Sequence, residues 1–265
     1  MAGSEGERGI MRVDLNERII LVTGATSGFG AATARRLHAA GATIVAAGRR
    51  AQRLTALADE LGPRLHSLTL DVRDQNAVAA AIDGLPPALA DIYGLVNNAG
   101  LARGMNSSDE ADLDDWNEMV DANIKGLMYV TRAVLPGMVT RGVGHIVNLG
   151  SVAGTYPYFG ANVYGASKAF VHQFSLDLRA DLVEKNIRVT SVEPGAAETE
   201  FSLVRFHGDA DKADATYKGF DPITADNVAD VIDYVLTAPA NININRIEIM
   251  AAQQGFAGFN FVRRD

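Results

Sequence analysis

The chain of 265 residues contains no cysteine. This absence excludes disulfides, thiolate zinc sites and a cysteine nucleophile, and a cytoplasmic location is the default expectation for such a chain. The histidines are few and show no metal-ligand spacing, so we expect no metal and interpret each as structural or exposed. They are His38, His66, His145, His172 and His207.

The chain also lacks a Lys/Arg run and any apolar stretch approaching the roughly 20 residues of a membrane span. With a formal net charge of -8, this composition argues against nucleic acid and anionic membranes as partners. The N-terminal segment 4–9 is polar, and we expect no secretory signal there. Because apolar residues make up 48% and charged residues 21%, the chain has the composition of an ordinary globular domain.

Short apolar segments alternate with segments of helical periodicity from about residue 16 onward. We expect residues 1–15 to form a flexible extension and residues 16–265 to form one domain. The alternation predicts a seven-stranded parallel sheet with helices on both faces, a Rossmann-type doubly wound α/β domain. The expected strands are 18–23, 43–47, 65–70, 93–97, 145–149, 188–192 and 242–250; the expected helices are 31–40, 52–61, 75–85, 112–139, 163–184 and 224–236.

A glycine-rich loop joins the first expected strand to the first expected helix. Glycines allow a close backbone approach, and a helix N-terminus offers free N–H groups, so this position favours a dinucleotide pyrophosphate. The alternative is a purely structural turn. The candidate cofactor-binding residues of this loop are Gly24, Thr26, Ser27, Gly28, Phe29 and Gly30.

The second expected strand ends in Gly48-Arg49-Arg50. An NAD-specific site usually has an acidic residue here, bonded to the ribose hydroxyl. Guanidinium groups in its place favour a 2′-phosphate. We therefore predict NADP as the cofactor, with Arg49 as the main contact and Arg50 assisting; two solvated arginines are the alternative.

Two further strand ends carry candidate cofactor residues. Asp71 and Val72 follow the third expected strand, where they suit contact with adenine, although an ordinary helix cap fits Asp71 nearly as well. The segment Asn97-Asn98-Ala99-Gly100 follows the fourth expected strand. Its small residues allow a cofactor to lie close, and its asparagines can also tie neighbouring strands together.

The most informative residues are Tyr164 and Lys168, which lie four apart on an expected helix and therefore share one face. A phenol has a pKa of roughly 10 in water, and a neighbouring ammonium favours the phenolate. The pair therefore suggests proton transfer to or from an alcohol oxygen. Ser151 lies 13 residues before Tyr164 and strengthens this interpretation.

Together these motifs resemble the short-chain dehydrogenase/reductase family over about residues 16–265. Within it, the segments 123–138, 154–164 and 200–206 and the tail from residue 241 resemble the NADP-dependent 3-hydroxy acid dehydrogenases. The motifs in chain order are Gly24-x-x-x-Gly28-x-Gly30, Asn97-Asn98-Ala99-Gly100, Asn123, Ser151, Tyr164-x-x-x-Lys168 and Pro194-Gly195.

The resemblance implies a role for each matching residue. Tyr164 would be the general acid-base, Lys168 would lower its pKa and hold the nicotinamide ribose, and Ser151 would hydrogen-bond the substrate oxygen. Asn123 would hold a water that links Lys168 to solvent. Residues that would line the nicotinamide side are Pro194, Gly195 and Thr199.

The substrates implied are small 3-hydroxy acids such as serine, allo-threonine and 3-hydroxyisobutyrate, or malonic semialdehyde in the reducing direction. We expect residues 196–222 to form a mobile lid, with Arg205 as the candidate for the substrate carboxylate. A solvent-facing or subunit-contact arginine is a nearly equal alternative for Arg205.

Two other functions remain open: reduction of a short-chain carbonyl or a 3-oxoacyl thioester, and non-catalytic regulation by NADP binding. The family resemblance also implies a homotetramer, formed through the long helices after the fourth and fifth strands. The aromatic tail 253–261 is expected to find a partner surface.

Overall fold

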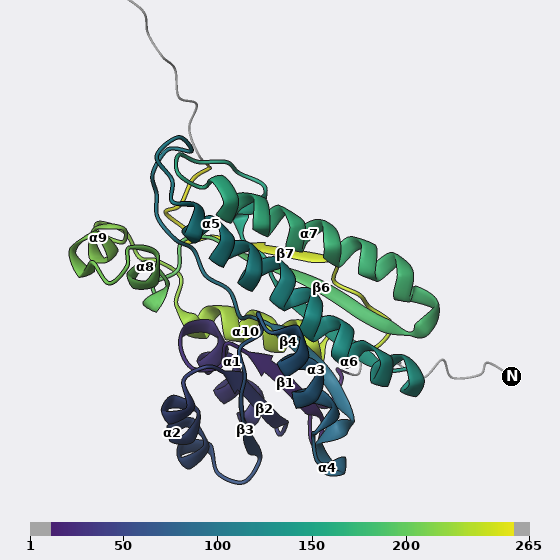
Figure 1. Cartoon of the computed structure of the whole chain (residues 1–265). Coiled ribbons are helices and arrows are strands. Elements are labelled where there is room, and N and C mark those ends of the chain that lie inside the picture. The colour runs from purple at the N-terminus through teal and green to yellow at the C-terminus, as the bar shows by residue number, and fades with distance from the viewer. Residues whose placement is uncertain (1–11, 257–265) are drawn as a thin grey trace, which may run out of the picture.

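In the computed structural model, which describes residues 12–256, seven parallel strands form one sheet, as predicted (Figure 1). Strand order is β3-β2-β1-β4-β5-β6-β7, so the direction of winding reverses between β1 and β4. In open sheets of this kind, ligands bind at the carboxyl ends of the strands beside such a reversal. The strands are β1 Ile19–Thr23, β2 Thr43–Gly48, β3 Leu65–Thr69, β4 Ile92–Asn97, β5 Gly144–Leu149, β6 Ile187–Pro194 and β7 Arg246–Ile249.

Helices cover both faces of the sheet because its central strands are apolar on both sides. On β1, Ile20 and Val22 pack toward one face and Leu21 toward the other, as the two-residue period of a strand requires. One face carries α1 Gly28–Ala39, α2 Ala51–Leu61 and α10 Ala225–Thr237, and the opposite face carries α3 Gln75–Asp83, α6 Leu127–Arg141 and α7 Asn162–Leu182 (Figure 1).

The helix expected over 112–139 consists of three consecutive helical segments. They are α5 Leu113–Val120, a π-helical stretch over Asp121–Gly126, and α6. Gly126 lies so close to Val72 that a Cβ on the glycine would be 2.6 Å from the valine Cγ2. The π-helical stretch therefore allows the helix to approach the end of β3, and it carries Asn123.

Three other details differ from the expected elements. The last strand covers only Arg246–Ile249 of the predicted 242–250. The predicted lid contains two short helices, α8 Glu200–Arg205 and α9 Ala210–Ala215, and α4 Pro87–Ala90 precedes β4.

Residues 13–15, which were expected to belong to the extension, contact the domain. Leu15 is part of the core, and the amide of Val13 donates a hydrogen bond to the Thr237 carbonyl. Residues 1–11 of the expected extension and 257–261 of the aromatic tail lie outside the described residues. Within residues 12–256, no helix combines the length and hydropathy needed to cross a membrane.

Candidate active site

The glycine-rich loop forms a close junction between β1 and α1. Gly24 and Gly28 have φ angles of 66° and 48°, a region that favours glycine. A Cβ on Gly30 would lie 2.3 Å from the Gly24 carbonyl oxygen. Ser27, which precedes α1, makes no side-chain hydrogen bond to the helix, so the first-turn N–H groups are available to an anion.

The asparagines at the end of β4 bind its neighbouring elements. The Asn98 amide donates to the Thr23 carbonyl oxygen at 2.9 Å, while the Asn97 amide donates to Thr131 and Asn148 at 2.9 Å each. The structure therefore shows the strand-tying role of both residues. Ala99 and Gly100 carry no polar side chain and leave room beside the loop.

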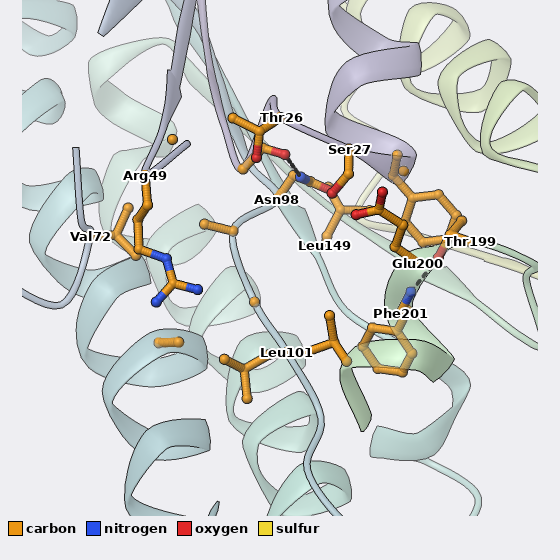
Figure 2. A pocket seen from close by; sticks show the side chains of 18 of the residues that line it. Thr26, Ser27, Arg49, Val72, Asn98, Leu101, Leu149, Thr199, Glu200 and Phe201 are labelled. Atoms are coloured by element: carbon orange, nitrogen blue, oxygen red, sulfur yellow. Dashed lines mark hydrogen bonds between the residues drawn. The ribbon is translucent and has the colours of Figure 1, made fainter. Parts of the chain in front are cut away.

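A cavity of about 290 Å³ lies over the carboxyl ends of the central strands, between the glycine-rich loop and α8 (Figure 2). Most of the residues predicted to bind the cofactor line it, whereas Gly30, Pro194 and Gly195 do not. The predicted residues on its wall are Gly24, Thr26, Ser27, Gly28, Phe29, Arg49, Arg50, Asp71, Val72, Asn98, Ala99, Gly100, Tyr164, Lys168 and Thr199.

The two arginines after β2 differ in their partners. Arg50 donates to Thr26 Oγ1 at 3.0 Å and to Ser27 Oγ, and it pairs with Glu200 at 3.0 Å. Arg49 is exposed, lies beside Val72 at the cavity (Figure 2), and makes no ion pair or hydrogen bond with another part of residues 12–256. Arg49 is therefore the guanidinium that is available to a ligand.

Asp71 already has a strong partner within its own loop. Arg73 contacts its carboxylate at 2.6 Å, and this hydrogen bond holds the pKa of Asp71 below its usual range. The carboxylate is thus ionised at neutral pH and turned toward Arg73. Val72 contributes the apolar surface at the same edge of the cavity.

A second cavity of about 320 Å³ adjoins the first, and Tyr164, Phe29 and Thr199 line both. Its wall brings together residues from the segment after β5, α7, the end of β6 and the predicted lid. Among its lining residues are Ser151, Tyr158, Tyr164, Pro194, Gly195, Arg205 and Tyr217. A ligand in the first cavity and one in the second would therefore meet at Tyr164.

Tyr164 lines both cavities, and Ser151 lines the second. The Ser151 hydroxyl accepts a hydrogen bond from the Ala153 amide at 3.1 Å and donates to the Pro194 carbonyl at 3.3 Å. Burial raises the pKa of Tyr164 to about 12, whereas a hydrogen bond with Ser151 and the charge of Arg205 act in the lowering direction. The phenol is therefore protonated at neutral pH in this arrangement.

Lys168 is buried one helical turn after Tyr164. Its Nζ donates to the Leu149 carbonyl at 2.7 Å and lies 5.9 Å from the centre of the Tyr164 ring. Burial lowers the pKa of Lys168 to about 8, and the negative charge of Glu193 opposes that shift. The ammonium is thus close to the phenol but bonded to the backbone.

Asn123 is buried beside these residues but lines neither cavity. Its side chain accepts from the Leu101 amide and donates to the Leu101 carbonyl, each at 2.8 Å, and it also donates to Ser167 at 3.0 Å. A Cβ on Gly100 would lie 3.0 Å from its Oδ1 and 3.7 Å from Lys168 Nζ. Asn123 therefore fixes the backbone next to the lysine.

Arg205 reaches the second cavity from the end of α8. Its side chain is 91% buried, donates to the Tyr158 hydroxyl at 2.6 Å, and lies 5.1 Å from the Tyr164 ring centre. No carboxylate pairs with it among residues 12–256. A buried, uncompensated guanidinium beside the phenol is a position suited to an anionic group of a ligand.

Sequence reasoning missed several residues of the site. Glu200 joins the lid to Arg50 and also to Arg53, at 2.7 Å. Tyr158 and Tyr217 reach the second cavity from separate loops. No local motif marks these side chains, because each becomes part of the site through contacts with distant segments.

The fold and this constellation agree with a family match: the family model described as short chain dehydrogenase matches residues 18–208. The chain belongs to the short-chain dehydrogenase family, as the sequence motifs predicted.

Particular relatives cover nearly the whole chain. Sulfoacetaldehyde reductase 2 of Chromohalobacter salexigens is 53% identical over 91% of this chain and 97% of its own length. The NADP-dependent 3-hydroxy acid dehydrogenase YdfG of Shigella flexneri is 51% identical over 93% of this chain and 100% of its own length. A solved structure of the closed form of serine dehydrogenase complexed with NADP+ has a TM-score of 0.92 at 51% identity, covering 93% of this chain and 100% of that one.

Proposed function

We propose that this protein is an NADP-dependent dehydrogenase that interconverts small 3-hydroxy acids and the corresponding carbonyl acids. The observation that carries this proposal is the buried guanidinium of Arg205, which faces the same cavity as Ser151 and the Tyr164 phenol. Relatives described as a 3-hydroxy acid dehydrogenase and a serine dehydrogenase support the substrate class.

The first cavity fits a dinucleotide. Its glycine junction permits a close backbone approach, and the N-terminus of α1 offers unpaired N–H groups for phosphate oxygens. Arg49 would bind the 2′-phosphate that distinguishes NADP from NAD, because its guanidinium is unpaired at the cavity edge. When bound, the nicotinamide supplies or accepts the hydride.

The proton chemistry belongs to the protein. In the reducing direction, the Tyr164 phenol would donate its proton to the substrate oxygen, while Ser151 would donate a hydrogen bond to that oxygen as charge develops on it. Lys168 would hold the positive charge that favours loss of the proton, and Asn123 would support the lysine and its water link to solvent. In the oxidising direction these transfers reverse.

Arg205 would bind the substrate carboxylate from the far wall of the second cavity. A charged hydrogen bond in a buried site is stronger than a neutral one and is directional. A sulfonate offers the same charge and similar acceptors, and one relative is described as a sulfoacetaldehyde reductase. We assign the carboxylate class to this chain because two of the three relatives are described as acting on a hydroxy acid or on serine.

Residues 196–222 would act as a lid on this site. Thr199 begins α8 by accepting a hydrogen bond from the Phe201 amide, and Glu200 in the next position pairs with Arg50 and Arg53 across the cavity. These exposed ion pairs contribute little energy, and such contacts permit the segment to open and close.

Features of the site distinguish this function from the two alternatives. A 3-oxoacyl thioester reductase would act on a neutral carbonyl and would not need a buried arginine. A non-catalytic NADP-binding regulator would not need Ser151, Tyr164 and Lys168 together.

The Tyr164→Phe variant tests the catalytic proposal directly. We expect it to bind NADPH normally in a fluorescence titration and to lose nearly all turnover, because phenylalanine keeps the ring but has no proton to donate. Turnover equal to that of the unmodified protein would refute the mechanism.

We also propose a homotetramer, assembled through α5, α6 and α7. Met128 on α6 is exposed, and Phe170 and Phe174 form a stacked pair on α7 with centroids 5.4 Å apart. These apolar side chains support an interface on that face of the sheet. A monomeric mass in light scattering would exclude the assembly. A cytoplasmic location stays a prediction from the composition.

A further inference from the structure

Glu193 is a carboxylate buried at the end of β6, with 1% of its surface exposed. It precedes Pro194, whose carbonyl accepts the hydrogen bond of Ser151. Removing a carboxylate from water is costly unless cations and donors surround it. Its partners therefore show what keeps it in place.

Three groups hold this carboxylate. On α7, His172 Nδ1 lies 2.7 Å from Oε1; on β7, an Arg246 nitrogen lies 2.7 Å from Oε2; and the Ser191 hydroxyl donates to Oε1 at 2.8 Å. Arg246 also pairs with Glu248 at 2.8 Å.

The cluster formed by Glu193, His172, Ser191 and Arg246 extends to the second cavity through Glu248. Glu248 accepts a hydrogen bond from the Tyr156 hydroxyl at 3.2 Å, and Tyr156 lines the second cavity. The carboxylate of Glu193 itself lines neither cavity. Any effect of Glu193 on the site would therefore pass through other residues.

The cluster lies next to the segments that hold Lys168 and Ser151. Lys168 and His172 are one turn apart on α7 and share a face. Lys168 donates to the Leu149 carbonyl, and the next residue, Gly150, packs on Glu193 so closely that a Cβ on the glycine would be 2.7 Å from the glutamate Cγ. Ser151 follows directly. One carboxylate thus supports the segment that holds the lysine and the serine.

We propose that Glu193 is a positioning residue for the reaction: it fixes the segment Leu149–Ser151 and places a negative charge near Lys168. This inference rests on the proposed function, because it concerns the lysine of that mechanism. Arg246 tunes the effect, since it offsets part of the charge of Glu193.

The negative charge of Glu193 should affect the pH dependence of the reaction. Burial lowers the pKa of Lys168 to about 8, while Glu193 opposes this shift. The other ionisable groups around the lysine and the cluster are Tyr164 and His172 on α7, Arg205 on the lid, Tyr156 on its loop, and Arg246 and Glu248 on β7. Because the mechanism uses the charged lysine, reduction should slow above about pH 8.

The test is the pH profile of kcat for reduction of malonic semialdehyde by NADPH in Glu193→Gln. The amide keeps the shape but removes the charge, so the lysine loses its proton at lower pH. We expect the alkaline limb of the profile to move toward acid by about one unit. Asp177→Asn, which removes an exposed carboxylate from α7, the helix that carries Lys168, is the matched control and should leave the limb unchanged.

Arg246→Gln supplies a second test with the opposite sign. It leaves the charge of Glu193 less compensated, so the alkaline limb should move toward higher pH, and Glu193→Asp should remain close to the unmodified protein. A structural role alone would lower kcat in both glutamine variants without moving the limbs in opposite directions.

The outcomes separate the two proposals. Absence of activity in the unmodified protein contradicts the proposed function. Normal activity, with alkaline limbs that coincide in Glu193→Gln, Arg246→Gln and the unmodified protein, overturns the role of Glu193. If Glu193→Gln does not fold, Arg246→Gln still tests the proposal. An alkaline limb that does not move in Arg246→Gln refutes the charge effect of Glu193.

Discussion

Replacing Arg205 by methionine should separate recognition of the substrate anion from the chemistry of reduction. Methionine is unbranched, flexible and uncharged, and its thioether suits the aromatic surroundings formed by Tyr158, Tyr164 and Phe201. The change removes one buried guanidinium and its 2.6 Å hydrogen bond to Tyr158. Folding should lose about 1 kcal/mol through that bond.

The effect on catalysis follows from the strength of the lost contact. A hydrogen bond to a charged group contributes about 1.5–3 kcal/mol. At about 1.4 kcal/mol per factor of ten, kcat/KM for a carboxylate substrate should fall about 10- to 150-fold. A neutral aldehyde should lose far less, and its loss measures the separate effect of the Arg205 charge on the pKa of Tyr164.

The assay compares kcat/KM for malonic semialdehyde and for a neutral aldehyde of similar size, with NADPH as the reductant. Lys212→Met is the matched control, because it removes a positive charge from the exposed surface of the same lid. Equal losses on the acid and the neutral aldehyde in Arg205→Met would refute the assignment of Arg205 to the carboxylate.

Two further predictions concern the cofactor. Arg49→Gln should weaken NADPH binding by about 10-fold or more, because a charged contact to phosphate is lost, and it should change NADH binding little. Fluorescence titration with both cofactors measures this difference. Equal weakening of both cofactors would contradict a 2′-phosphate contact. Glu200→Gln should speed NADP release by about 1.4- to fivefold in stopped-flow measurements, since an exposed ion pair typically contributes about 0.2–1 kcal/mol. The exposed Glu184→Gln is the control, and unchanged release in Glu200→Gln would exclude its part in holding the lid.

Local patterns account for what could be predicted from the sequence. The strand-helix alternation and the glycine spacing around Gly28 act over a few residues, and they predicted the fold class and the loop correctly. The family followed from motifs such as Tyr164-x-x-x-Lys168 in chain order. The relatives described as using NADP and hydroxy acids agree with the predicted cofactor and substrate class.

The remainder depends on contacts between distant segments. Arg50 meets Glu200 across 150 positions, so the residue's own surroundings in the sequence did not reveal its partner. Glu193 lies in a fully buried strand, and its partner Arg246 belongs to the next strand of the sheet.

Short helices were also hard to foresee. The helices α8 and α9 span six residues each, too few for an apolar period to become visible. The π-helical turn at Asn123 differs from an α-helix by one residue per hydrogen-bonded turn, and a hydrophobic pattern does not resolve that difference.

The most direct test of the central claim is NADP reduction by the unmodified protein with L-serine, L-allo-threonine, 3-hydroxyisobutyrate and simple secondary alcohols, repeated with NAD. The account predicts turnover on the hydroxy acids with NADP and little or none with NAD, because Arg205 would bind the carboxylate and Arg49 would bind the 2′-phosphate. Turnover on neutral alcohols alone would contradict the 3-hydroxy acid assignment, and equal rates with NAD would contradict the role of Arg49.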